Sequence, residues 1–176
     1  IFLDCLTVYG TQIFWPIWSY PVGSGSIFIV DPFYTVPLLV GVIAALVMRQ
    51  HSHWEYRLNI TGLTLSTLYL LWSVSAQHYV IKMVEDSLDR QSIQYQQLLV
   101  SAAPLNTLLW RVVAIKDDGN YYEGFYSLLD QSEDVSLHQH KSQNHLLTEV
   151  QQSWPVKRLI WFTKGYLKVW ENSGDI

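Results

Sequence analysis

The stretch NTLLWRVVAIKDDGNYYEGFYSLLD, residues 106–130, predicts a β-hairpin. Its two arms are rich in β-branched and aromatic residues, and the Asp-Asp-Gly-Asn sequence between them is typical of a tight turn. Further along the chain we expect a short strand at 135–138 and a helix at 142–152. After Trp154-Pro155 we expect a helix or a strand, a break at Gly165 and a final strand. This mixture predicts the α+β class, with a small antiparallel sheet and helices packed on it.

The composition excludes several classes of protein. The 176 residues include 15 acidic and 11 basic side chains, for a net charge of -4. No basic patch is therefore available to neutralise phosphates, and we do not expect a nucleic-acid partner. The single cysteine, Cys5, excludes an internal disulfide framework and a Cys-rich zinc site.

Charged residues are unevenly distributed along the chain. Residues 1–80 contain only five of them, and residues 33–48 and 58–81 contain none. Trp and Tyr lie near the ends of these two apolar stretches, as in the interfacial belts of membrane helices. We therefore expect a membrane-helical region at 1–80, with a re-entrant or interfacial loop at 9–33, and a soluble α+β domain at 81–176. A pair of core helices in a soluble protein is the alternative.

The orientation follows from the polar turn RQHSHWEYR between the two stretches. Its Arg49 and Arg57 place the turn in the cytoplasm by the positive-inside rule. The C-terminal domain would then be periplasmic. Apolar and charged residues mix at helical spacing over 78–99, which predicts an amphipathic helix that continues from the second span.

The six histidines do not form a recognisable metal motif. His51 and His53 are typical of a solvated turn, and His138 and His140 lie in a polar stretch that favours an exposed loop. His78, near the end of the second apolar stretch, is either functional or at a membrane interface. The sequence GSGS at 23–26 lacks the lysine of a phosphate-binding loop, and we interpret it as a flexible loop.

Two carboxylates stand out in the charge-poor half. Asp31-Pro32 precedes the first apolar stretch, where the aspartate can cap a helix and proline can take its first position. Asp4 follows three large apolar residues, and no basic residue occurs before Arg49. A buried carboxylate needs a partner or a metal ion. The chain begins in mid-pattern, so we read it as part of a longer protein; a His directly before Ile1 would share a helix face with Asp4.

Several short sequence motifs together resemble those of a known family. They are LD-x-x-T-x-YGTQ-x-x-WP, SIFI-x-DP-x-YT-x-PLL, LYL-x-WS, NTLLWRVVA and YYEGFYSLLD. In this order they are similar to the bacterial inner-membrane metal-dependent hydrolases, the family related to the LexA-regulated membrane protein. The resemblance covers nearly the whole chain, without the N-terminal His motifs of that family.

The resemblance implies a divalent metal ion, with zinc as the first expectation, and it implies that Asp4 is one of its ligands. It also implies that Tyr9, Gln12 and Asp31 support the ligand or contact the substrate. The expected protein is a multi-pass protein of the bacterial inner membrane that contacts membrane lipids and hydrolyses a lipid or a phosphoester. As a fragment without the upstream His ligands it would be inactive alone.

The alternative is a membrane-anchored interaction protein. In this interpretation the C-terminal α+β domain recognises a partner through exposed aromatic side chains, those of Trp154, Trp161, Tyr166 and Trp170. The same side chains could instead belong to the core of the sheet. A transporter or channel is disfavoured because the two apolar stretches offer no evident polar pathway.

Overall fold

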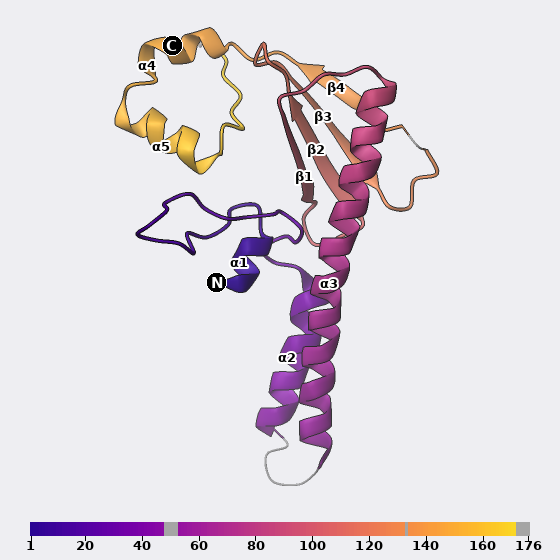
Figure 1. Cartoon of the computed structure of the whole chain (residues 1–176). Helices are drawn as coiled ribbons and strands as arrows, with labels where there is room; N and C mark the ends of the chain where they lie inside the picture. Colours follow the sequence, from indigo (N-terminus) through magenta and orange to yellow (C-terminus); the bar gives the residue numbers. More distant parts are fainter. Residues whose placement is uncertain (48–52, 133, 172–176) are drawn as a thin grey trace, which may run out of the picture.

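The computed structural model describes residues 1–47, 53–132 and 134–171 (Figure 1). A long helical hairpin leads into an antiparallel sheet with strand order β1-β2-β3-β4. The larger elements are α2 (Pro32–Val47), α3 (His53–Arg90), β1 (Gln97–Ala102), β2 (Leu109–Ile115), β3 (Tyr121–Ser127) and β4 (Leu137–His140). The shorter ones are α1 (Phe2–Leu6), η1 (Asn144–Leu146), α4 (Leu147–Val150) and α5 (Trp154–Phe162).

The hairpin of residues 106–130 forms as its sequence predicts. β2 and β3 pair from Leu109–Ser127 to Ile115–Tyr121. In the turn, Gly119 has a φ of +80°, which a residue with a Cβ adopts only at a cost. The Asp118 carboxylate accepts a hydrogen bond of 2.9 Å from the Asn120 amide. The α+β class with an antiparallel sheet is therefore the architecture of the C-terminal half.

The first strand of the sheet was not predicted. The expected helix over 78–99 ends at Arg90, and Ser92 has a φ of 55° at the reversal that follows. β1 then pairs with β2, from Gln97–Ile115 to Ala102–Trp110. The apolar spacing of this segment fits the period of a helix as well as that of a strand, and its pairing with β2 makes it a strand. The final strand expected after Gly165 does not form, because residues 166–171 are irregular. The Gln143 backbone amide donates a hydrogen bond of 2.8 Å to the Val169 carbonyl in this segment.

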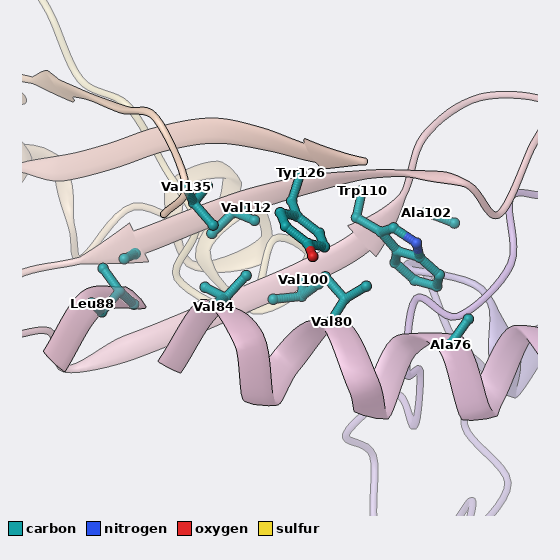
Figure 2. Close-up of a cluster of buried hydrophobic side chains, with 11 residues drawn as sticks. Ala76, Val80, Val84, Leu88, Val100, Ala102, Trp110, Val112, Tyr126 and Val135 are labelled. Atoms are coloured by element: carbon teal, nitrogen blue, oxygen red, sulfur yellow. The ribbon is translucent and has the colours of Figure 1, made fainter. Parts of the chain in front are cut away.

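The core lies between the second half of α3 and one face of the sheet (Figure 2). Residues at intervals of four on α3 point to the sheet, because residues i and i+4 of an α-helix lie on the same face. They are Ala76, Val80, Val84 and Leu88. The facing sheet residues are Val100, Ala102, Trp110, Val112, Ala114 and Tyr126, with Val135 closing one end. The core thus joins the helical hairpin to the strands through one continuous helix.

The first half of α3 packs against α2 through small residues. A Cβ on Gly62 would overlap the Pro37 carbonyl oxygen, and one on Gly41 would lie 3.3 Å from the Asn59 Cα. The Ser66 hydroxyl donates to the Tyr34 carbonyl at 2.9 Å. The close approach of the two backbones leaves their large apolar side chains on the outside of the pair.

The prediction of membrane-spanning helices was wrong. Within the described residues, neither α2, α3 nor any shorter helix combines the length and the hydropathy needed to cross a bilayer. α2 has 16 residues, about 24 Å at 1.5 Å per residue, against a hydrocarbon core of about 30 Å. α3 is long enough, but Asn, Thr, Ser and Gln residues interrupt its apolar pattern. A multi-pass topology and a periplasmic C-terminal domain therefore have no support.

The boundaries of the hairpin also differ from expectation. Residues 53–57 of the turn predicted over 49–57 belong to α3, and its other residues, 49–52, lie outside the described part of the chain. α3 continues without a break past residue 80. The division of the chain into regions 1–80 and 81–176 stays a prediction.

The loop that follows α1 is attached to both α3 and the sheet. Gly25, Ser26 and Ile27 are buried, and the Ala102 amide donates to the Gly25 carbonyl at 2.9 Å. The Gln77 side-chain amide donates to the carbonyls of Ser24, at 2.6 Å, and Val100. The GSGS sequence is thus a packed connection rather than the flexible loop that we expected.

Candidate functional site

Asp4 lies on α1 at the rim of a surface hollow. Its side chain is 61% exposed. The hollow has a volume of about 370 Å³ and is lined by Leu3, Asp4, Thr7, Tyr9, Gly10, Thr11 and Ile29. The Thr7 hydroxyl donates to the Asp4 backbone carbonyl at 2.8 Å and fixes the end of this short helix. The carboxylate is therefore open to a cation, in a concave setting.

Tyr9 separates this hollow from a second one. Its ring lies 5.9 Å from that of Phe162 on α5, and it lines both hollows. The second hollow, of about 550 Å³, is also bordered by Gln12, Trp15 and Arg158. The structure therefore brings Tyr9 close to Asp4 on one side and to Gln12 on the other.

Gln12 organises the exposed loop after α1. Its Nε2 donates to the Ser19 carbonyl at 2.7 Å, across the loop. At the base of the loop, the Thr11 and Val22 backbones exchange two hydrogen bonds of 2.9 Å. Gly10, with a φ of +70°, allows this closure because a Cβ there would overlap the Val22 carbonyl. Gln12 thus has a structural partner on one of its two polar atoms.

Asp31 has a different environment. It is 1% exposed, and among the described residues it lines neither of these hollows. Its Oδ1 accepts from the Phe33 amide at 2.9 Å, which is the capping role that the sequence indicates. Its Oδ2 accepts from the Tyr69 hydroxyl at 2.8 Å. Asp31 therefore joins the start of α2 to α3, apart from Asp4.

Tyr69 extends this buried network to the sheet. Its hydroxyl accepts from the Thr107 hydroxyl at 3.2 Å, and Thr107 accepts in turn from the Trp72 indole at 3.2 Å. The pKa of Tyr69 is raised to about 12, mainly by burial; the Thr107 hydrogen bond lowers it and the neighbouring Asp31 carboxylate contributes to the rise. The sequence contained the signal for the cap but none for Tyr69, which comes 38 residues after Asp31.

The histidines do not assemble into a ligand set. Within residues 1–47, 53–132 and 134–171, no three His, Cys, Asp or Glu side chains lie close enough to hold one metal ion. His78 is exposed on α3, with its Nδ1 2.8 Å from the Val74 carbonyl. His140 on β4 stacks on Tyr121 with a ring separation of 5.1 Å. His51 lies outside the described residues.

Sequence reasoning missed the contact between the N-terminal loop and α5. Arg158 on α5 stacks over the Trp161 ring, 4.1 Å from its centroid, and both residues line the second hollow. Lys164 Nζ donates to the backbone carbonyls of Val8, at 3.5 Å, and Gly23, at 3.3 Å. Partial burial there lowers the pKa of Lys164. More than 130 residues separate the partners, so no local pattern could indicate the contact.

A further hollow lies on the opposite side of the sheet from α3. It has a volume of about 180 Å³ between β1–β3 and residues 165–168. Arg111 contributes to its wall, and its guanidinium forms an ion pair of 2.8 Å with Glu123. The charges of Arg111 and Glu123 compensate each other, and Lys168 also lines this hollow.

Comparison with known proteins extends over the N-terminal part only. Residues 1–80 match the family described as YdjM inner membrane protein. No curated protein and no solved structure matches the chain. The matched region contains Asp4, the loop after α1, α2 and most of α3. The family description gives a location and no reaction, so the comparison indicates similarity to a bacterial inner-membrane family over residues 1–80.

Proposed function

We propose that this protein is a membrane-associated, metal-dependent hydrolase of the bacterial inner membrane that acts on a lipid or a phosphoester. The observation that carries the proposal is Asp4. Its exposed carboxylate lines a hollow of about 370 Å³, where a cation can reach it. The match of residues 1–80 to an inner-membrane family supports the location.

The donor set of the described residues does not complete a zinc site. Catalytic zinc uses three protein ligands of the His, Cys, Asp or Glu type. Asp4 is one such ligand, and no cluster of three occurs among the described residues. The proposal therefore requires ligands in addition to those that the structure describes, and we derive no reaction step through a metal ion.

The neighbours of Asp4 are suited to contact a substrate. Tyr9 is 54% exposed, and its phenol can donate a hydrogen bond. Gln12 has an amide whose nitrogen is held by the Ser19 carbonyl, which orients the rest of the group. The hollow that both residues line has a volume of about 550 Å³, within the range of about 300–1,000 Å³ that is common for ligand sites. We propose these two residues as substrate contacts, and we propose a structural role for Asp31 because it is buried.

The metal proposal predicts a specific effect of Asp4→Asn. This change keeps the size of the side chain and removes its charge, so the variant should lose bound zinc and metal-stimulated hydrolysis of a phosphodiester probe. Metal content is measured by mass spectrometry after purification, and turnover is measured with and without a chelator. Asp117→Asn, in the exposed turn of the β-hairpin, is the matched control and should leave both quantities unchanged. These measurements use the full-length protein: a full-length wild type that binds no divalent ion, or an Asp4→Asn variant equal to wild type, contradicts the proposal.

A non-enzymatic role is the second candidate. Trp154 is 75% exposed and Trp170 is 64% exposed, which favours a recognition surface on the C-terminal part. In this case the protein is a membrane-anchored binding protein, and deletion of residues 100–176 abolishes partner capture. Metal-dependent turnover that survives in a Trp154→Ala/Trp170→Ala variant, together with unchanged partner capture, would reject it.

A further inference from the structure

The loop from Ile13 to Tyr20 is an exposed aromatic segment. Every residue in it is exposed, and no charged residue occurs between Asp4 and Asp31. Its rings stack on one another, with centroid separations of 5.9 Å for Phe14–Trp18 and 6.4 Å for Trp18–Tyr20. Trp and Tyr are enriched where a membrane meets water, because their rings combine an apolar body with a polar group. The stacking presents this loop as one surface rather than as separate side chains.

The segment around α5 supplies positive charge. Residues 151–170 contain four basic residues and no acidic one, in a chain with a net charge of -4. These four are Lys157, Arg158, Lys164 and Lys168. Arg158 lies over the Trp161 ring at 4.1 Å, and Lys168 lies over the Trp170 ring at 5.9 Å. Basic and aromatic groups therefore occur together here, on a segment whose charge is opposite to that of the whole protein.

The structure joins the loop and α5 into one surface. Trp15 from the loop and Arg158 from α5 line the same hollow of about 550 Å³. The Tyr9–Phe162 ring contact and the Lys164 hydrogen bonds to the Val8 and Gly23 carbonyls hold the two segments together. Figure 1 shows both segments on the same side of the molecule, away from the α2–α3 hairpin. We call residues 13–20 and α5 together the loop–α5 surface.

We propose that the loop–α5 surface docks onto a membrane by binding anionic lipid headgroups. Charge complementarity carries the proposal, since Arg158 lines a hollow with Trp15 of the uncharged aromatic loop and Lys157, next to it on α5, is also exposed. Such a combination of basic and aromatic groups is suited to the headgroup region. A binding site for nucleic acid would need a larger basic patch than these few residues provide. The inference rests on the membrane association proposed above, but not on the metal or on the hydrolase activity.

The test uses the purified full chain and vesicle co-sedimentation. One set of vesicles contains phosphatidylcholine alone, and in the other about a third of the lipid is phosphatidylglycerol, which supplies negative charge. Lys157→Gln/Arg158→Gln should bind the anionic vesicles about 25-fold more weakly than wild type, because each basic residue near such a surface contributes about fivefold. Binding of this variant to neutral vesicles should not change.

Two further variants separate charge from aromatic contact. Trp15→Ala/Trp18→Ala should bind both kinds of vesicle more weakly, because it removes ring contact with the headgroup region. Lys82→Gln/Lys141→Gln removes two exposed charges elsewhere, on α3 and after β4, and should bind as wild type does. Circular dichroism of each variant confirms that the fold is kept. At about 1 M salt, where the Debye length is about 3 Å, the preference for anionic vesicles should disappear.

Several outcomes overturn the inference without affecting the proposed hydrolase. Wild type that binds neutral and anionic vesicles equally, or a Lys157→Gln/Arg158→Gln variant that binds like wild type, excludes a docking role for these charges. The absence of any vesicle binding, together with capture of a protein partner by the same residues, assigns the surface to protein recognition. Zinc content and phosphodiester turnover are measured on the full-length wild type and on Asp4→Asn, because Trp15 and Arg158 also line the hollow proposed for the substrate. Failure of the hydrolase proposal therefore remains a separate result.

Discussion

The two halves of α3 differ in what they do with their apolar side chains. In the second half, Val80, Val84 and Leu88 have no exposed surface, because they pack on the sheet (Figure 2). In the first half, Leu68 and Leu71 are 55% and 61% exposed, although their helix is packed against α2. One helix therefore contains a stretch that completes a core and a stretch whose large side chains point away from its partner.

The difference follows from which residues make the helix contacts. The first half packs through Gly62 against Pro37, so small residues occupy the interface and large ones are left outside. No charged residue occurs over 58–81, whereas Lys82, Glu85, Asp86 and Asp89 follow on the faces of α3 that do not contact the sheet. A one-sided apolar pattern with charges opposite is typical of a helix that covers a core. Absence of charge alone, by contrast, does not indicate which face is buried.

The largest expected effect is on the core half of the helix. Leu88→Ala should lower the free energy of unfolding by about 2–5 kcal/mol, because it removes a fully buried side chain and leaves a cavity. Leu68→Ala is the matched change in the first half. It should alter the free energy of unfolding by no more than about 0.5 kcal/mol, because the Leu68 side chain is largely exposed and loses little packing. Urea denaturation monitored by tryptophan fluorescence measures both. Equal losses for the two variants would remove the distinction between the halves.

The parts of the fold that could be predicted are those with an unambiguous local sequence pattern. The hairpin of residues 106–130 was predictable because its turn and its alternating arms are local signals. β1 was not, because the apolar spacing of residues 97–102 fits a helix as well as a strand, and only the pairing with β2 decides between them. The membrane spans at 33–48 and 58–81 were inferred from lack of charge, and the polar residues of α3 and the length of α2 decide against them.

In the candidate site, contacts between residues that are close in sequence could be predicted, and contacts between residues that are far apart in sequence could not. The capping role of Asp31 was readable from Asp-Pro before a helix, but its hydrogen bond to Tyr69 was not. Asp4 was singled out because it lacked a basic neighbour in sequence, and the structure places it beside Tyr9 on an open hollow. The contribution of α5 to the neighbouring hollow depends on tertiary packing, which no motif in the sequence encodes.

The close packing of the first half can be tested at its tightest point. Gly62→Ala places a Cβ against the Pro37 carbonyl oxygen, which is backbone and cannot rotate away. The helices must separate, and we expect a loss of about 1–3 kcal/mol in the free energy of unfolding. Thr61→Ala, one residue earlier on an exposed face, is the control and should have little effect. A stable Gly62→Ala variant would show that the α2–α3 contact tolerates a wider spacing.

The last expected effect concerns the link between the two halves. Tyr69 lies near the middle of α3 and joins Asp31 to Thr107, so Tyr69→Phe removes one hydrogen bond from each side. Near neutral pH the cost should be about 1–3 kcal/mol, because two hydrogen bonds are lost and one of them goes to the buried Asp31 carboxylate. Tyr56→Phe, on an exposed position of the same helix, is the control.

The dependence on pH makes the Tyr69 prediction specific. Burial raises the pKa of Tyr69 to about 12 in the folded protein, against about 10 in an unfolded chain. Between these values the unfolded state releases the phenolic proton and the folded state retains it, so the free energy of unfolding falls as pH rises from about 10 to 12. The full stabilisation is present below pH 10. Tyr69→Phe should show a shallower decline over this window than Tyr56→Phe, because the remaining buried tyrosines are common to both. Parallel declines would mean that the Tyr69 hydroxyl is not buried between the two halves.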